Sequence, residues 1–282
     1  MRRRHRAYRL QAALKPARIY PILNHTVCLR VSYDGTAYAG WAVQVDQRTV
    51  ASTLLEAVRV MSPDVRALRG TSRTDAGVHA RDQIVAFMTD ANIPSRGWVL
   101  GTNTHLPRDI AVNAAAVIEG EFLPRFHVNH KTYTYTVRAG RIRDPLRRDT
   151  SWHVPYEVDM ALLRAEALTC LGTHDFAAFR SSQDTRKNTI RTISALDMTE
   201  RDGCIVFRVT GTGFMHNMVR ILVGSLLEVG GSRRPPGTIK KAMLSGLRAD
   251  AGMTAPPQGL CLDHTDVRWP EFKHAWWPEP GA

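Results

Sequence analysis

Stretches with the two-residue hydrophobic period of a β-strand alternate along this chain with stretches of helical period, and this alternation limits the folds open to it. The segment HKTYTYTVRAG alternates strictly, which predicts a strand with one face made of Lys131, Tyr133, Tyr135 and Val137. Two tyrosines side by side on a strand are more often packed in a core than used to stack on a base. Because no internal repeat is visible, a mixed α and β protein is expected rather than a solenoid.

The other elements are predicted from the same two periods. Thr49 is a suitable N-cap for a helix with one apolar face, made of Val50, Leu54, Val58 and Met61. Further strands are expected at residues 27–33, 65–71, 83–89, 189–199 and 204–210, and further helices at 160–171 and 214–229. The last helix ends at a pair of glycines, which is a common C-terminal signal.

The connection between the strands expected at 65–71 and 83–89 holds the sequence SRTDAGVHA, with a single carboxylate at Asp75. Two interpretations are open. An Asp followed closely by Gly is a frequent turn signal. A loop that is held by a rigid sheet is also a common place for a catalytic group.

The apolar helix expected at 214–229 carries one cation. His216, Arg220 and Val223 share a face at helical spacing, so a guanidinium is set into an otherwise apolar element. Burying a charge without a partner is costly. Arg220 is therefore predicted to pair with an anion.

The chain is strongly basic, with a formal net charge of +12 and a pI near 10.1, which favours a polyanionic partner. Residues 1–25 hold seven of the positive charges and no Asp or Glu, so the rest of the chain, 12 less 7, carries +5. This leader is expected to be disordered and to add non-specific affinity for RNA.

Several functions are excluded by residue types. One Asp-Ala-Gly without a second copy does not make an aspartic protease, and neither HExxH nor Gly-x-Ser-x-Gly occurs. The two glycines of GTGF are too weak a signal for a nucleotide site, so no cofactor is predicted. The four cysteines lie far apart and are expected to be reduced thiols without a metal: Cys28, Cys170, Cys204 and Cys261. No signal peptide or membrane span is recognised, which favours a cytoplasmic location and no membrane partner.

Seven segments, in order from about Thr26 to Trp269, together resemble the tRNA pseudouridine synthase A family. They are SYDGTAYAGW, SRTDAGVHA, NTHLPRDIAV, RFHVNHKTYTYTV, LGTHDFAAF, GFMHNMVRILVGSLLEVG and APPQGLCL. One such segment is a weak signal, but seven in the family's order are highly specific.

The resemblance implies an isomerase that converts uridine to pseudouridine at positions 38 to 40 in the anticodon arm of tRNA, with no cofactor and no metal. The bond from ribose to the ring nitrogen breaks, the uracil turns, and ribose is rejoined to carbon 5. Asp75 would be the catalytic carboxylate, acting as nucleophile or proton acceptor, and Arg220 its partner. Tyr133 would pack against the target base and assist proton removal from carbon 5. Arg73 would occupy the space that the flipped base leaves.

The fold implied by the resemblance is α+β, with two similar α+β domains whose antiparallel sheets join into one extended sheet with helices on one face. The expected segments are a leader at 1–25, an N-terminal domain at 26–120, a C-terminal domain at 121–270 and a tail at 271–282. A homodimer is expected, with the two subunits together holding one tRNA. Two alternatives stay open: an RNA-binding or RNA-chaperone protein on the same scaffold, and a pseudouridine synthase with a different uridine target.

Overall fold

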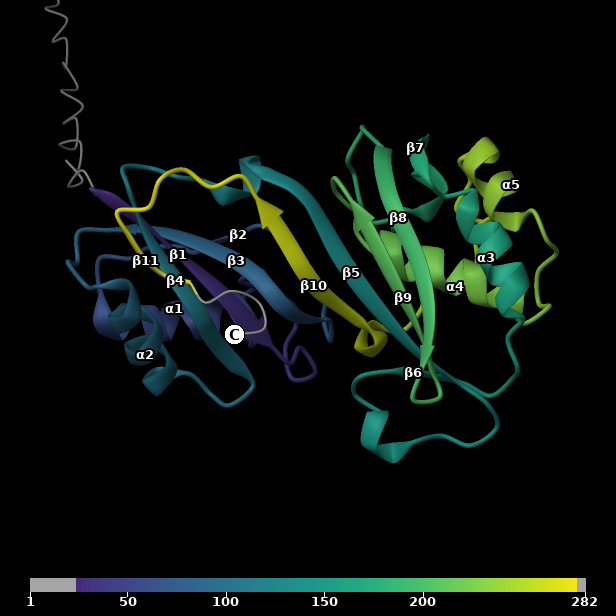
Figure 1. Ribbon diagram of the computed structural model, residues 1–282, viewed down its shortest axis with the longest axis horizontal. Coiled ribbons are helices and arrows are strands. Elements are labelled where there is room, and N and C mark those ends of the chain that lie inside the picture. Colours follow the sequence, from purple (N-terminus) through teal and green to yellow (C-terminus); the bar gives the residue numbers. More distant parts are fainter. Residues whose placement is uncertain (1–23, 278–282) are drawn as a thin grey trace, which may run out of the picture.

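A computed structural model describes residues 24–277, which form one 11-stranded sheet and five α-helices (Figure 1). The strands are β1 (His25–Tyr33), β2 (Arg69–Gly70), β3 (His79–Thr89), β4 (Ile110–Glu119), β5 (Val128–Ala139), β6 (Trp152–Val154), β7 (Gly172–Asp175), β8 (Ile190–Arg201), β9 (Cys204–Gly211), β10 (Leu260–Val267) and β11 (His274–Trp276). The α-helices are α1 (Val50–Met61), α2 (Ser95–His105), α3 (Met160–Leu168), α4 (Met218–Gly230) and α5 (Thr238–Ser245). Short 3-10 turns are η1 (Pro124–Phe126), η2 (Pro145–Arg147), η3 (Ala177–Phe179) and η4 (Pro257–Gly259).

The strand β10 joins the two halves of the sheet. The strand order is β11-β4-β1-β3-β10-β5-β9-β8-β7, with β2 on β3 and β6 on β5. β10 runs parallel to β3, where Leu262 faces Ala80, and antiparallel to β5, where Leu262 faces Tyr133. Figure 1 shows β10 at the middle of the molecule, between β3 and β5. The predicted α+β fold with one extended sheet is confirmed.

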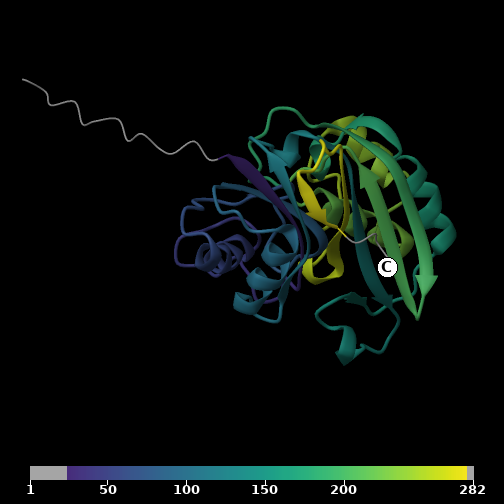
Figure 2. The same cartoon turned by 60° about the vertical axis from the view of Figure 1, so that its left-hand side comes forward.

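The helices pack on one face of the sheet. On β1, Val27 and Leu29 belong to the same buried cluster as Leu54 of α1 and Leu222 of α4. Cys28, which points the other way, belongs to a separate cluster on the opposite face, with the C-terminal aromatics Trp269, Phe272 and Trp277 packed against it. Figure 2 shows α1 and α2, in blue, beside one end of the sheet and α3 to α5, in teal to lime, beside the other.

The expected leader at 1–25 lies outside the described residues except for its last two, and β1 already begins at His25. At the other end, the expected tail at 271–282 is described as far as residue 277. Its residues His274–Trp276 form β11, which pairs with β4 and so returns the chain to the first half. Within residues 24–277, no helix is both long and apolar enough to cross a membrane, and no group of three or more potential metal ligands occurs.

The predicted helix after Thr49 is confirmed. The side chain of Thr49 accepts from the backbone of Ser52, and the side chain of Ser52 accepts from the backbone of Thr49, which completes a capping box. The strand predicted from HKTYTYTVRAG is also confirmed as part of β5 (Val128–Ala139), with Tyr135 and Val137 fully buried on the face that was expected. The capping contacts of the helix are close in sequence, whereas the strand pairs with the distant β9 and β10.

Three predicted boundaries are wrong. The strand expected at 83–89 begins four residues earlier, at His79. The strand expected at 65–71 is reduced to Arg69–Gly70. The Arg59 side chain donates to the backbone carbonyls of Val65 and Arg66 at 2.8 and 3.0 Å, so these carbonyls are not available for strand pairing. The helix expected from 214 begins four residues later, at Met218. Asn217, just before it, has a left-handed backbone (φ 62°), which no helix interior tolerates.

Candidate active site in the cleft between the two halves

Asp75 lies in the loop between β2 and β3, and this loop is held by side chains from the sheet below it. Gln83 accepts from the Ser72 backbone N–H at 3.0 Å and donates to the Ser72 carbonyl at 2.6 Å. The hydroxyls of Tyr33 and Thr74 are 2.7 Å apart. Each contact fixes a residue within three positions of Asp75, so the carboxylate stands on a rigid support.

The glycines of DGTAYAGW let a second loop lie directly on the Asp75 loop. Gly40 has φ +97°, and a Cβ added there would be 2.7 Å from the Thr74 carbonyl oxygen. A Cβ on Gly35 would be 2.0 Å from the Val78 carbonyl oxygen. Next to Gly40, the backbone N–H of Trp41 donates to the Thr74 carbonyl at 3.0 Å. Two of the sequence motifs thus form one packed unit around Asp75.

Gly40→Ala should therefore damage the site, and Gly120→Ala is the matched control. Gly120 also has a positive φ, +70°, but nothing lies within 4 Å of an added Cβ. Both substitutions should cost about 1 to 3 kcal/mol of unfolding free energy for the strained backbone, measured by urea denaturation. Only Gly40→Ala should also lower turnover, because it pushes against the backbone beside Asp75. Equal turnover in the two variants would show that the contact does not position the loop.

Two cationic or basic side chains from the second half reach Asp75. Arg220 Nη1 is 3.2 Å from Asp75 Oδ2, and His216 Nε2 is 3.3 Å from Oδ1. The side chains of Arg220 and Asp75 are 14% and 19% exposed, so the pair is shielded from water but still open to a ligand. The structure brings together the anion and the guanidinium that the sequence analysis expected to meet, although 145 positions separate them.

Arg220 is itself fixed by two further acceptors. Its Nη1 donates to Asn217 Oδ1 at 2.7 Å, and its Nε donates to the Ala255 carbonyl at 2.8 Å. His216 and Asn217 received no role in the sequence analysis. His216 lies before α4 rather than on it, and next to the left-handed Asn217 its side chain reaches Asp75, whereas the Asn217 side chain contacts Arg220. The sequence signal that could have indicated these two residues is their position, four and three residues before Arg220.

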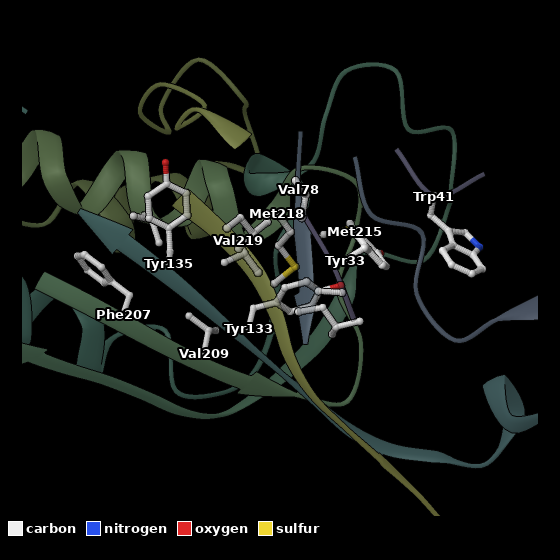
Figure 3. Packing of buried hydrophobic residues seen from close by; sticks show 14 of the residues in the cluster. Tyr33, Trp41, Val78, Tyr133, Tyr135, Phe207, Val209, Met215, Met218 and Val219 are labelled. Atoms are coloured by element: carbon white, nitrogen blue, oxygen red, sulfur yellow. The ribbon is translucent and has the colours of Figure 1, made fainter. Parts of the chain in front are cut away.

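Tyr133 lies on β5 beside Asp75. It is 8% exposed, and its ring meets that of Phe214 edge-on at 5.2 Å between centroids. Figure 3 shows Tyr133 among Val78, Met215 and Met218, whereas Tyr135, two positions on, lies away from this group. Burial raises the pKa of Tyr133 to about 12, with the charge of Asp75 as a smaller cause. At neutral pH the phenol is therefore protonated.

These groups open onto a cavity of about 880 Å³ between the two halves. The first half contributes Arg73 and Asp75, and the second contributes Lys131, Tyr133 and His216. The volume lies within the range of ligand pockets, roughly 300 to 1,000 Å³. Arg73 is exposed two positions from Asp75 and lines the same cavity. The predicted site residues Asp75, Arg220, Tyr133 and Arg73 are thus all found at or beside one cleft.

The loop between β7 and β8 forms another wall of the cavity, which the sequence analysis did not foresee. Asp184 accepts from the His216 backbone N–H at 3.1 Å and pairs with Arg186 at 2.7 Å. Burial by itself would raise the pKa of Asp184. The hydrogen bonds from Arg186 and from backbone N–H groups outweigh burial and hold the pKa well below its usual range. Asp184 is therefore an ionised anchor that ties this loop to the segment carrying His216.

Comparison of the sequence with known proteins places this chain in a family. A profile described as "tRNA pseudouridine synthase" matches residues 167–270. The tRNA pseudouridine synthase A of Citrifermentans bemidjiense is 44% identical over 83% of this chain and 94% of its own length. The enzymes of the same name from Geobacter sulfurreducens and Shouchella clausii are 42% and 38% identical, over 84% and 86% of this chain and 97% and 94% of their own lengths.

Proposed function

Because this chain belongs to the tRNA pseudouridine synthase A family, we propose that it acts on uridines at positions 38 to 40 of the anticodon arm, with Asp75 as the essential carboxylate. The chain is an isomerase that converts uridine to pseudouridine in tRNA, as membership of the family shows. The positions in tRNA and the roles of the individual side chains are the parts that we propose.

The environment of Asp75 supports its role. The reaction is neither an oxidation nor a hydrolysis, so it requires no redox group and no activated water. What it requires is an ionised carboxylate that can act as nucleophile or proton acceptor. Arg220 Nη1 lies 3.2 Å from one oxygen of Asp75 and His216 Nε2 lies 3.3 Å from the other, so the carboxylate is held in place where it lines the cavity. The single observation that carries the proposal is this pair, formed across the two halves and opening onto the cavity.

Tyr133 is proposed to pack against the target uracil. It lines the same cavity as Asp75, and its ring meets that of Phe214 edge-on. Because the pKa of Tyr133 is raised to about 12 by burial, the phenol offers an O–H donor in the free protein. It can assist removal of the carbon 5 proton only after losing its own proton to another group.

Arg73 is proposed to enter the space that the target uridine leaves. The Asp75 side chain lies in a cleft and is 19% exposed, so a base stacked in an RNA stem cannot reach it. The uridine must therefore be flipped out of the stem, at a cost of a few kcal/mol. Arg73 is exposed at the mouth of the cavity, two residues before Asp75. A flipped base held at Asp75 would place Arg73 beside the gap in the stem.

The homodimer and the cytoplasmic location belong to the same proposal. Both are supported by membership of the family. A tRNA held across two subunits would also make use of the basic surface that the net charge of +12 implies.

The proposal is tested by mapping pseudouridine in tRNA from cells with and without this gene. We expect loss of pseudouridine at positions 38 to 40 and retention elsewhere, with recovery on expression of the parent protein but not of Asp75→Asn. Loss at another position would favour the alternative of a different uridine target. Unchanged tRNA would favour the alternative of an RNA-binding protein without turnover.

A further inference from the structure

The cavity holds one ammonium group that the reaction, as proposed above, does not use. Lys131 lies on β5 two positions before Tyr133, so both side chains project from the same face of the strand, roughly 7 Å apart along it. Its Nζ donates to the carbonyl of Thr71, in the Asp75 loop, at 2.6 Å.

This ammonium has donors to spare. A lysine carries three N–H donors, and one hydrogen bond, to Thr71, is formed by Lys131 within residues 24–277. No carboxylate of that part of the chain pairs with it. Two N–H donors therefore remain available on the side of the cavity that Lys131 lines.

The surroundings of Lys131 are positive. Arg125 of η1 and Arg186 of the β7–β8 loop are close enough to lower the pKa of Lys131, after burial as the main cause, to about 8. The two carboxylates that line the cavity are engaged elsewhere, Asp75 with Arg220 and His216 and Asp184 with Arg186. A partly desolvated cation with free donors and no counterion is matched by an anion with several acceptor oxygens.

We propose that Lys131, together with Arg125, forms a phosphate subsite that holds the RNA backbone next to the flipped uridine. This inference rests on the proposed function, because it takes the occupant of the cavity to be a nucleotide of tRNA. Lys131 also contacts the Asp75 loop through Thr71, so a phosphate at this point would be bound by a group that is tied to both halves of the site.

Protonation of Lys131 gives the subsite a pH dependence with a defined sign. A lowered pKa means that the ammonium is lost as pH rises through about 8, earlier than for a free lysine. A bound phosphate favours the charged form, so binding takes up a proton in this range and weakens as pH rises. The charged groups facing Lys131 are Arg125 and Arg186, with Asp184 paired to the latter, and Arg73 and the Asp75 pair across the cavity.

The test measures binding of a transcribed tRNA by Asp75→Asn protein, in which turnover is blocked, with and without substitution of Lys131. Lys131→Met should reduce the slope of log affinity against log salt by about 0.7 to 0.9, the value for one lost phosphate contact. Lys131→Arg should keep the slope and lose the weakening between pH 7 and 8.5, because a guanidinium stays charged. The control is Lys241→Met, which removes an exposed lysine already paired with Asp250 at 2.7 Å and should change neither property.

The occupant is identified with an anticodon stem-loop that carries a neutral methylphosphonate on one side of the target uridine. This RNA should bind the protein that keeps Lys131 more weakly, by the same factor by which Lys131→Met weakens binding of the unmodified RNA. Binding to the Lys131→Met protein should be equal for the modified and the unmodified RNA. An unchanged salt slope in Lys131→Met, whether or not its melting temperature falls by more than about 4 °C, would overturn the proposal and leave Lys131 as a clamp on Thr71. Turnover by the parent protein, measured in parallel, separates this failure from a failure of the proposed function.

Discussion

Asp75→Asn should abolish isomerisation and leave tRNA binding within a few-fold of the parent. The amide keeps the size of the side chain and can still accept from Arg220, but it lacks the charge and the nucleophilicity of the carboxylate. Loss of a negative group that faces phosphates could even tighten binding slightly. Release of tritium from carbon 5 of uridine counts turnovers directly, since that hydrogen leaves when the new carbon bond is formed. We expect no release above background.

The matched control for this prediction is Asp263→Asn. Asp263 is also a largely buried carboxylate with two cationic partners, Arg81 at 2.9 Å and Arg208 at 2.6 Å, but it does not line the cavity. Its amide variant should release tritium at the parental rate. If Asp75→Asn also releases tritium at that rate, Asp75 is a turn residue, and the carboxylate that performs the reaction must be sought elsewhere.

Arg220→Leu should have the second-largest effect, lowering turnover by about a hundredfold or more, as expected when one preorganised electrostatic partner is removed. The stability cost should stay below the roughly 3 to 5 kcal/mol for breaking a fully buried ion pair. Asp75 keeps His216 at 3.3 Å and is partly hydrated through the cavity. Tritium release at saturating tRNA and urea denaturation measure the two effects.

Arg234→Leu is the control for Arg220→Leu. Arg234 has the same kinds of partner, a carboxylate at 2.7 Å on Glu228 and a backbone carbonyl at 3.2 Å on Asp250, but lies outside the cavity. It should lose stability to a comparable degree and keep its turnover. Normal turnover by Arg220→Leu at neutral pH would show that its contact with Asp75 is structural alone.

Much of the secondary structure could be predicted because it depends on neighbours in sequence. The capping box at Thr49 and Ser52 lies within four residues, and the alternation from Lys131 to Val137 needs no partner to be recognised. The errors arose where a single side chain or backbone angle overrode the hydrophobic pattern. Arg59 captures the carbonyls of Val65 and Arg66 and shortens β2. The left-handed Asn217 delays α4, although the apolar pattern extends before it.

The residues of the candidate site, and the pairing of Asp75 with Arg220, could be chosen from the sequence by resemblance, but the further contacts of this pair could not. The need of Arg220 for an anion followed from its apolar helix, whereas His216 was not recognised as a second contact of Asp75. Lys131 appeared only as one member of an alternating strand. Only the tertiary structure shows that Lys131 has unused N–H donors and that Arg125 and Arg186, from two separate segments, lie near it.

By itself, the sequence determined the periods of the strands and helices, the glycines that permit close packing, and the identity of the charged residues. The tertiary structure alone decided which of these groups meet. The register of β10, with Leu262 facing Ala80 of β3 on one side and Tyr133 of β5 on the other, sets the two halves at the spacing that brings Asp75 to Arg220 and Lys131 to Thr71. Hydrophobic period is a property of neighbouring residues, whereas a distance between residues 145 positions apart depends on how whole sheets pair.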